Sequence, residues 1–243
     1  TTSKTERAPC QNRRRFRCIR LTEEMIWIVD YFYPNPDEIR NRALMLDYTR
    51  GKSTNKARVT HILHPGHRNN PKREFWWENR IYLRNRWKDI AGVQVLDFES
   101  MKSSCAFNMG FAERENTFNW VHSDSGWGPG PRMYACVLYL TPNPPANTGT
   151  LLFEHKGSIF DEQEKKKDKK RYHPQFYGDY WKDPISTNPA WKMHCKVENR
   201  YNRLVMYDAR MLHAPENAGF GDTKETARLT QIGFWYGEDR VQI

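Results

Sequence analysis

The sequence predicts an α+β protein that is mainly β, with N-terminal helices flanking an antiparallel double sheet or jelly roll. Two observations support this prediction. Helical patterns are confined to the first part of the chain, and short strand patterns separated by turns fill the rest. A chain of 243 residues suits one such domain. We therefore expect a single domain over residues 25–243, after a basic segment over residues 1–24.

Residues 25–92 are expected to supply a strand and the supporting helices. The segment from Met25 to Tyr33 is short, apolar and rich in β-branched and aromatic residues, which is typical of a buried strand. A helix is predicted directly after it, because Asn35 suits the N-cap and Pro36 the first helical position. A second helix is predicted over residues 75–90, where an apolar stripe includes Trp76, Leu83, Trp87 and Ile90.

Residues 51–73, between the two helices, are polar, basic and rich in turn formers, which predicts a loop. The loop contains His61, His64 and His67 at three-residue intervals. Pro65 and Gly66 would break any helix that aligned these histidines. We expect a surface loop, or a lid that contacts the substrate, and not a metal cluster.

Residues 93–243 are expected to form the jelly-roll core. Seven segments have strand patterns: 93–98, 106–111, 118–122, 132–141, 150–155, 203–207 and 228–236. Residues 156–202 form a long insertion, lysine-rich first and then aromatic, and insertions of this length in compact domains are commonly lids or disordered segments. We expect the insertion to shape a substrate pocket.

The composition limits the class of protein. The 39 Lys and Arg against 29 Asp and Glu give a net charge of +10, but much of the excess lies in two runs, at 13–17 and 165–171, which are typical of solvated segments. Five cysteines without C-x-x-C spacing indicate neither a disulfide framework nor a zinc ribbon. No apolar run is long enough for a transmembrane helix and no signal segment is visible, so we expect a cytoplasmic protein without membrane contact.

The sequence FNWVHSD, from Phe118 to Asp124, is the strongest chemical signal in the chain. In an extended segment His122 and Asp124 point to the same side, because alternate side chains share a face. An imidazole and a carboxylate together suit Fe(II), and a second histidine from a distant strand would complete a 2-His-1-carboxylate triad. The candidate is His213. Such a triad leaves positions open for substrates.

The order of motifs in the second half resembles that of the iron(II)- and 2-oxoglutarate-dependent dioxygenases, in particular the prolyl-hydroxylase-like branch and related bacterial and phage proteins. The HSD motif is followed by Tyr139-Leu140, then TGTLLF at 148–153, a strand carrying LVMY, His213, and finally Arg228-Leu229-Thr230. The resemblance covers roughly residues 105 to 237.

The resemblance implies a cupin-like double-stranded β-helix in which His122, Asp124 and His213 bind Fe(II). It also implies that Arg228 pairs with the distal carboxylate of 2-oxoglutarate, and an arginine fork suits a carboxylate. Tyr139 and Thr230 are further candidates for that subsite. The implied activity is hydroxylation, in which O2 and 2-oxoglutarate are consumed and a C–H bond of a small-molecule or peptide substrate is oxidised.

Other functions stay open at this point. Tyrosines and a tryptophan mixed with lysines in the insertion could stack on bases, as in single-strand binders, which would suit a nucleic-acid oxygenase or demethylase. This partner is less favoured than a small molecule or peptide. A catalytically inactive jelly roll, or a basic nucleic-acid-binding protein, is the alternative from another class. That reading predicts salt-dependent nucleic-acid binding that chelators do not affect.

Overall fold

The computed structural model describes residues 16–21, 24–50, 67–69, 73–95, 105–112, 123–124, 131–155 and 191–239. These residues form a mainly β protein with two antiparallel sheets and two helices. The large sheet has nine strands in the order β1-β2-β10-β7-β12-β6-β4-β3, and β5 pairs with the far end of β12. The small sheet has the order β11-β8-β9.

The elements have the following bounds. The strands of the large sheet are β1 (Phe16–Leu21), β2 (Glu24–Val29), β3 (Thr49–Arg50), β4 (His67–Asn69), β5 (Val93–Val95), β6 (Ala106–Gly110), β7 (Arg132–Tyr139), β10 (Leu204–Asp208) and β12 (Arg228–Asp239). Those of the small sheet are β8 (Thr150–His155), β9 (Trp191–Val197) and β11 (Leu212–Pro215). The helices are α1 (Pro36–Leu44) and α2 (Arg73–Ala91).

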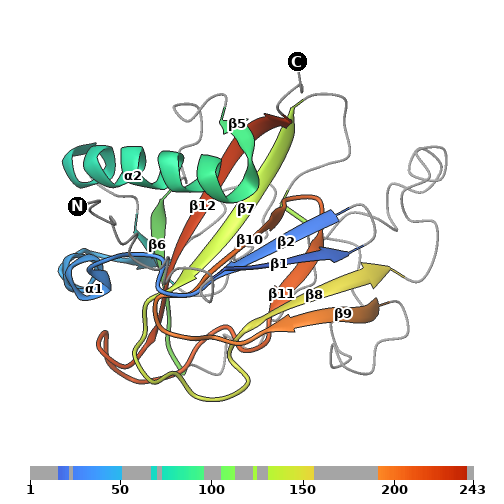
Figure 1. Cartoon of the computed structure of the whole chain (residues 1–243). Helices are drawn as coiled ribbons and strands as arrows, with labels where there is room; N and C mark the ends of the chain where they lie inside the picture. The colour runs from blue at the N-terminus through green and yellow to red at the C-terminus, as the bar shows by residue number, and fades with distance from the viewer. Residues whose placement is uncertain are drawn as a thin grey trace, which may run out of the picture.

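The large sheet separates two layers. The helices α1 and α2 lie on one side of it, and β8, β9 and β11 lie on the other (Figure 1). Because side chains alternate along a strand, each strand of the large sheet contributes to both layers. We call the two sides the helix-side face and the inner face.

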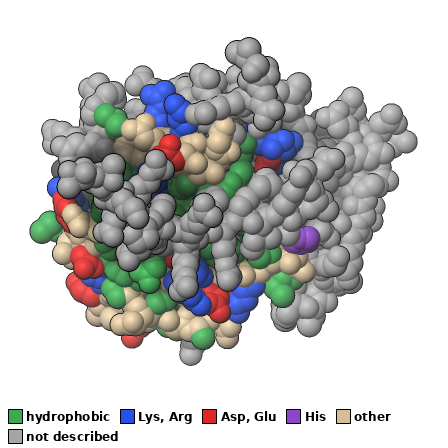
Figure 2. Space-filling view, viewed as in Figure 1, with side chains coloured by type: hydrophobic (Ala, Val, Ile, Leu, Met, Phe, Trp, Pro, Cys, Tyr) green, Lys and Arg blue, Asp and Glu red, His purple; other side chains and the backbone are tan. Residues whose placement is uncertain are grey.

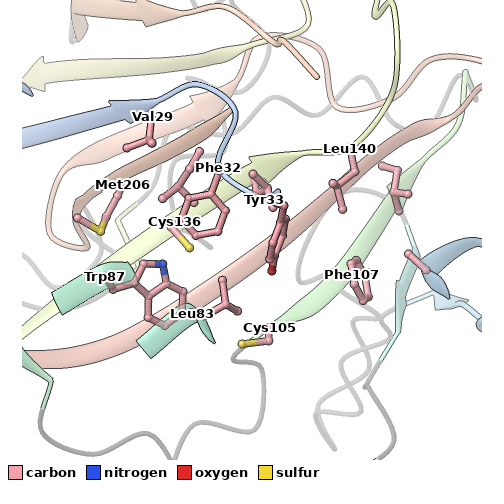
Figure 3. Packing of buried hydrophobic residues seen from close by; sticks show 14 of the residues in the cluster. Val29, Phe32, Tyr33, Leu83, Trp87, Cys105, Phe107, Cys136, Leu140 and Met206 are labelled. Atoms are coloured by element: carbon pink, nitrogen blue, oxygen red, sulfur yellow. The ribbon is translucent and has the colours of Figure 1, made fainter. Parts of the chain in front are cut away.

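The helix-side face carries the larger apolar core. Leu229 and Trp235 of β12 pack there with Cys136 of β7 and with Leu83 and Trp87 of α2. Figure 3 shows the two α2 side chains near Cys136 and Met206 of the sheet. The ring centroids of Trp87 and Trp235 are 3.9 Å apart and the rings are nearly parallel. Close aromatic packing therefore holds α2 against the sheet.

The inner face packs against the small sheet. Its apolar residues alternate with those of the helix-side face. They are Ile26, Met133, Ala135, Tyr139, Val205 and Tyr207, and they cluster with Leu152 of β8 and Val197 of β9. By the same alternation Arg228 and Thr230 of β12 belong to the inner face, because Phe234 and Tyr236 further along the strand pack against this cluster. Arg228, Thr230 and Tyr139 thus lie between the sheets.

Both predicted helices are confirmed. Pro36 is the first residue of α1, and Asp37 and Glu38 lie in its first turn, where negative charge favours the helix dipole. Asn35 occupies the N-cap position, but its side chain forms no capping hydrogen bond. Gly92 follows α2 with φ +68°, and its N–H donates to the carbonyl of Lys88 at 3.0 Å. A glycine is favoured at this left-handed position.

The predicted strands differ from the observed ones mainly at their ends. The strand at 150–155 is found with the same bounds as β8, and the strand predicted at 228–236 extends to Asp239 as β12. Cys136 is buried in β7. The strand predicted at 118–122 lies outside the described residues.

Five strands were not expected from the sequence. β3 is only two residues long and lies just before the predicted loop. β1 lies in the basic segment 1–24 and pairs with β2 over its full length. β4 begins at His67 within the predicted loop, whereas His61 and His64 lie outside the described residues. β9 occupies the end of the predicted insertion, and β11 carries His213. These strands are short or polar, and their extended conformation is stabilised by pairing with the neighbouring strand.

The described surface carries both signs of charge. On the face shown in Figure 2, Lys and Arg side chains lie beside Asp and Glu side chains at several places. Exposed pairs of this kind include Arg42 with Glu38 and Arg200 with Glu198, and they contribute little stability. Of the two basic runs, only Arg17 belongs to the described residues. Neither helix in the described part of the chain is long and apolar enough to cross a membrane.

Candidate functional site

Asp124 and His213, two of the three predicted metal ligands, lie next to each other. Oδ2 of Asp124 is 3.3 Å from Nε2 of His213. His213 is almost fully buried, and the side chain of Asp124 retains 20% exposure. The chain brings these residues together although the whole predicted insertion separates them in the sequence.

Backbone carbonyls hold both residues. The N–H of Asp124 donates to the carbonyl of Ala209 at 2.8 Å, and Nδ1 of His213 lies 3.0 Å from the carbonyl of Met211. Because a carbonyl only accepts, Nδ1 is the protonated nitrogen in this contact. Nε2 then points at the carboxylate. It either carries a second proton or offers its lone pair to a cation.

The separation of the two atoms suits a shared metal ion. An imidazole nitrogen and a carboxylate oxygen that bind one ion at right angles, each about 2.1 Å away, lie about 3 Å apart. The observed 3.3 Å is close to that value and is long for a direct hydrogen bond. The third predicted ligand, His122, lies outside the described residues. Among the residues that the structure describes, no group of three metal-binding side chains is found.

Arg228 forms a second, cationic part of the site. It is the first residue of β12 and retains only 5% exposure. Its Nε donates to the carbonyl of Thr148 at 3.4 Å, and its guanidinium carbon lies 5.7 Å from the ring centroid of Tyr139. No carboxylate within the described ranges forms an ion pair with it. Burial lowers the pKa of Arg228, but an arginine remains charged at neutral pH.

Tyr139 and Thr230, the other two predicted residues of this subsite, lie beside Arg228. Thr230 pairs with Tyr139 across the β12–β7 ladder and with Asn108 across the β12–β6 ladder. The hydroxyls of Tyr139 and Thr150 are 2.6 Å apart. Burial raises the pKa of Tyr139, and Arg228 opposes this shift. The structure thus collects a buried cation and several hydroxyl groups on one face of the sheet.

Tyr207 connects the two parts of the site, and the sequence analysis missed it. Its ring centroid is 4.8 Å from that of His213. Burial, followed by the negative charge of Asp124, raises the pKa of Tyr207 well above its usual range, and Arg228 opposes the shift. The group is therefore within electrostatic reach of both Asp124 and Arg228. The alternation of the strand LVMYD, which turns Val205 and Tyr207 to one face, was the available signal.

Thr148, Thr150 and Asn108 were also missed as residues of the site. Each contacts a predicted residue through a backbone group or a hydroxyl group, and such contacts leave no sequence motif.

The site contains groups that can bind a cation and an anion. The Asp124 and His213 pair offers oxygen and nitrogen to a borderline divalent cation, and Arg228 offers a buried positive charge to an anion. Asp124 and His213 therefore suit two ligand positions of an iron ion, and Arg228 suits one carboxylate of a dicarboxylate.

The fold is similar to that of a solved alpha ketoglutarate dependent enzyme. The crystal structure of the non-heme alpha ketoglutarate dependent epimerase SnoN from nogalamycin biosynthesis is similar with a TM-score of 0.51 and 11% sequence identity. The similarity covers 89% of this chain and 80% of that chain. A Pseudomonas putida prolyl-4-hydroxylase is similar with a TM-score of 0.45 and 16% identity, over 88% of this chain and 92% of that chain. The expected structural similarity to 2-oxoglutarate- and iron-dependent oxygenases is confirmed over most of the chain.

Comparison of the sequences gives a separate result. No curated protein matches the chain. One family model matches it over residues 11–235, a range that contains every described strand of the small sheet and all the predicted site residues. The chain therefore belongs to DUF6445, a family of unknown function.

Proposed function

We propose that this protein is an Fe(II)- and 2-oxoglutarate-dependent dioxygenase built on a double-stranded β-helix. One observation carries the proposal: the fold places the carboxylate of Asp124 3.3 Å from Nε2 of His213. The buried cation of Arg228 supports it, because a guanidinium offers paired donors that suit a carboxylate such as that of 2-oxoglutarate.

In this proposal His122, Asp124 and His213 hold the iron. When bound, iron and 2-oxoglutarate supply the oxidising chemistry, in which O2 is consumed, the cosubstrate is decarboxylated and a substrate C–H bond is hydroxylated. The carbonyl of Met211 holds the imidazole of His213 in the orientation that directs Nε2 toward Asp124. A fixed ring lowers the cost of assembling the site when the metal binds.

Arg228 is assigned to the distal carboxylate of 2-oxoglutarate. A buried guanidinium without an acidic partner among the described residues is costly, and an incoming carboxylate would offset that cost. Nε is occupied by the carbonyl of Thr148, so the two terminal nitrogens are the donors that face the ligand. Tyr139 and Thr230 lie beside Arg228 on the inner face and supply hydroxyl groups to the same subsite.

The substrate is proposed to be a small molecule or a peptide. A nucleic-acid-directed oxygenase is the less favoured alternative, because it rests on aromatic residues mixed with lysines in residues 156–202, most of which lie outside the described residues.

Anaerobic titration of Fe(II) and 2-oxoglutarate into chelator-treated protein tests the proposal. The visible charge-transfer band of the chelate is followed in wild type, Asp124→Ala, Arg228→Met and the control Arg200→Met, which changes an exposed arginine. We expect a band for wild type and the control, none for Asp124→Ala, and a need for far more cosubstrate in Arg228→Met. A reduced wild-type protein that shows no band would overturn the proposal.

A further inference from the structure

The turn from Asp208 to Met211, which joins β10 to β11, contacts both Asp124 and His213. Its Ala209 carbonyl accepts the N–H of Asp124 at 2.8 Å. Its Met211 carbonyl lies 3.0 Å from Nδ1 of His213. A four-residue segment thus sets the position of one candidate ligand and the ring orientation of the other. A change in the shape of this turn would therefore alter the position of Asp124 and the ring orientation of His213.

The side chain of Asp208 holds the turn in shape. The N–H of Met211 donates to the Asp208 carbonyl at 2.9 Å, which closes the turn. The carboxylate oxygen Oδ1 accepts from the backbone N–H of Arg210 at 3.0 Å and from its Nε at 2.8 Å. The other oxygen, Oδ2, accepts from Nη2 of Arg210 and forms an ion pair with Nε of Arg132 at 3.4 Å.

Asp208 is buried, whereas its two partners reach the surface. The Asp208 side chain retains 3% exposure, against 25% for Arg210 and 37% for Arg132. The buried carboxylate therefore binds the turn to β7, and the N–H of Ala209 adds a second link through the carbonyl of Met133. Two guanidinium groups share one carboxylate, so the contacts are charge-assisted and directional.

We infer that Asp208 is a positioning residue for the metal site, acting through the carbonyls of Ala209 and Met211. This inference rests on the proposed function, because it concerns the affinity of the same site for its metal. Partners behind the ligands typically change metal affinity by about 10- to 100-fold when they are altered. Asp208 does not touch either ligand in any contact described for it, so its effect would be transmitted by the shape of the turn.

The test is a titration of Co(II) into chelator-treated protein, read from the visible d–d absorption bands. The variant is Asp208→Asn, which keeps the size of the side chain and removes its charge. The matched control is Asp30→Asn. Asp30 forms the same two-point ion pair with Arg203, at 2.5 and 2.9 Å, next to the opposite end of β10.

We expect Asp208→Asn to raise the dissociation constant of Co(II) about 10- to 100-fold and to shift the d–d bands. Asp30→Asn should lower the melting temperature but leave the dissociation constant of Co(II) within about twofold. A general loss of stability would move the melting temperature in both variants without changing the spectrum. Equal Co(II) affinity and spectra in wild type and Asp208→Asn would overturn the inference while leaving the proposed function intact.

If Asp208→Asn does not fold, Arg210→Gln is compared with wild type in its place. This variant keeps the backbone N–H that donates to the Asp208 carboxylate and removes the guanidinium. An unchanged affinity in Arg210→Gln would then overturn the inference. A wild-type protein that binds no Co(II) would contradict the proposed function, and the inference would be lost with it.

Discussion

The two faces of the nine-stranded sheet use alternate residues of the same strands for different purposes. On the helix-side face, β12 presents Leu229, Gly233 and Trp235 to an apolar core, and Trp235 stacks on Trp87 of α2. On the inner face, the same strand presents Arg228 and Thr230 to a buried polar site. One strand therefore contributes to both the apolar core and the candidate site.

The difference between the two faces shows that the buried polar groups of the candidate site lie on the inner face of the sheet. Burial of apolar area stabilises the helix-side face, at roughly 25 cal/mol per Å² removed from water. The inner face contains a buried arginine, and burying a charge without a partner costs free energy. The comparison predicts that substitutions in the helix-side core reduce stability most, whereas substitution of Arg228 on the inner face reduces ligand binding most.

The largest expected effect comes from Trp87→Ala. Trp87 is fully buried and its ring stacks on Trp235, so its removal should lower the free energy of unfolding by about 3–5 kcal/mol. Denaturant unfolding followed by circular dichroism measures the change. The control Ile81→Ala alters a half-exposed residue of the same helix and should cost less than about 1 kcal/mol. If Trp87→Ala lowers the free energy of unfolding no more than the control does, the helix-side core does not have the stabilising role assigned to it.

Arg228→Met should separate stability from binding on the inner face. We expect the affinity for 2-oxoglutarate to fall about 100-fold, which corresponds to about 2.7 kcal/mol. The free energy of unfolding of the ligand-free protein should stay the same or rise, because an apolar side chain replaces a buried cation. Calorimetric titration and denaturant unfolding give the two quantities. A variant that loses stability but keeps its affinity would assign Arg228 to the structure instead.

Gly233→Ala tests how closely α2 approaches the sheet. A Cβ at this position would lie 2.7 Å from Cη2 and 2.8 Å from Cζ2 of Trp87. Since this ring is fully buried, the substitution should cost about 1–3 kcal/mol of stability. A double-mutant cycle with Trp87→Leu provides the check, because a smaller side chain should relieve the contact. Purely additive effects would show that the ring is not the cause.

Tyr139→Phe should have the smallest effect. It removes the hydroxyl that lies 2.6 Å from that of Thr150, at a cost of about 1 kcal/mol. Thr150→Val should cost a similar amount, and the double variant should cost little more than either alone, because both remove the same hydrogen bond. Thermal unfolding measures all three. If the two losses add, the hydroxyls act independently.

Local sequence patterns were sufficient to predict much of the fold and to propose part of the site. The strand β8 and the beginnings of α1 and β12 follow from alternation, capping residues and turn formers within a few positions. The spacing of His122 and Asp124 indicated Asp124 as a candidate ligand in the same way. These features depend on neighbours in the sequence, so the sequence contains the information directly.

The remaining features depend on residues that are distant in the chain. β1 becomes a strand by pairing with β2, and β9 by pairing with β8, although neither has a strong pattern of its own. The 3.3 Å approach of Asp124 to His213 and the contact of Tyr207 with that histidine also arise from packing. The role inferred for Asp208 rests on two backbone carbonyls, which every residue possesses. Backbone contacts and strand register are set by three-dimensional packing, because no side-chain motif encodes them.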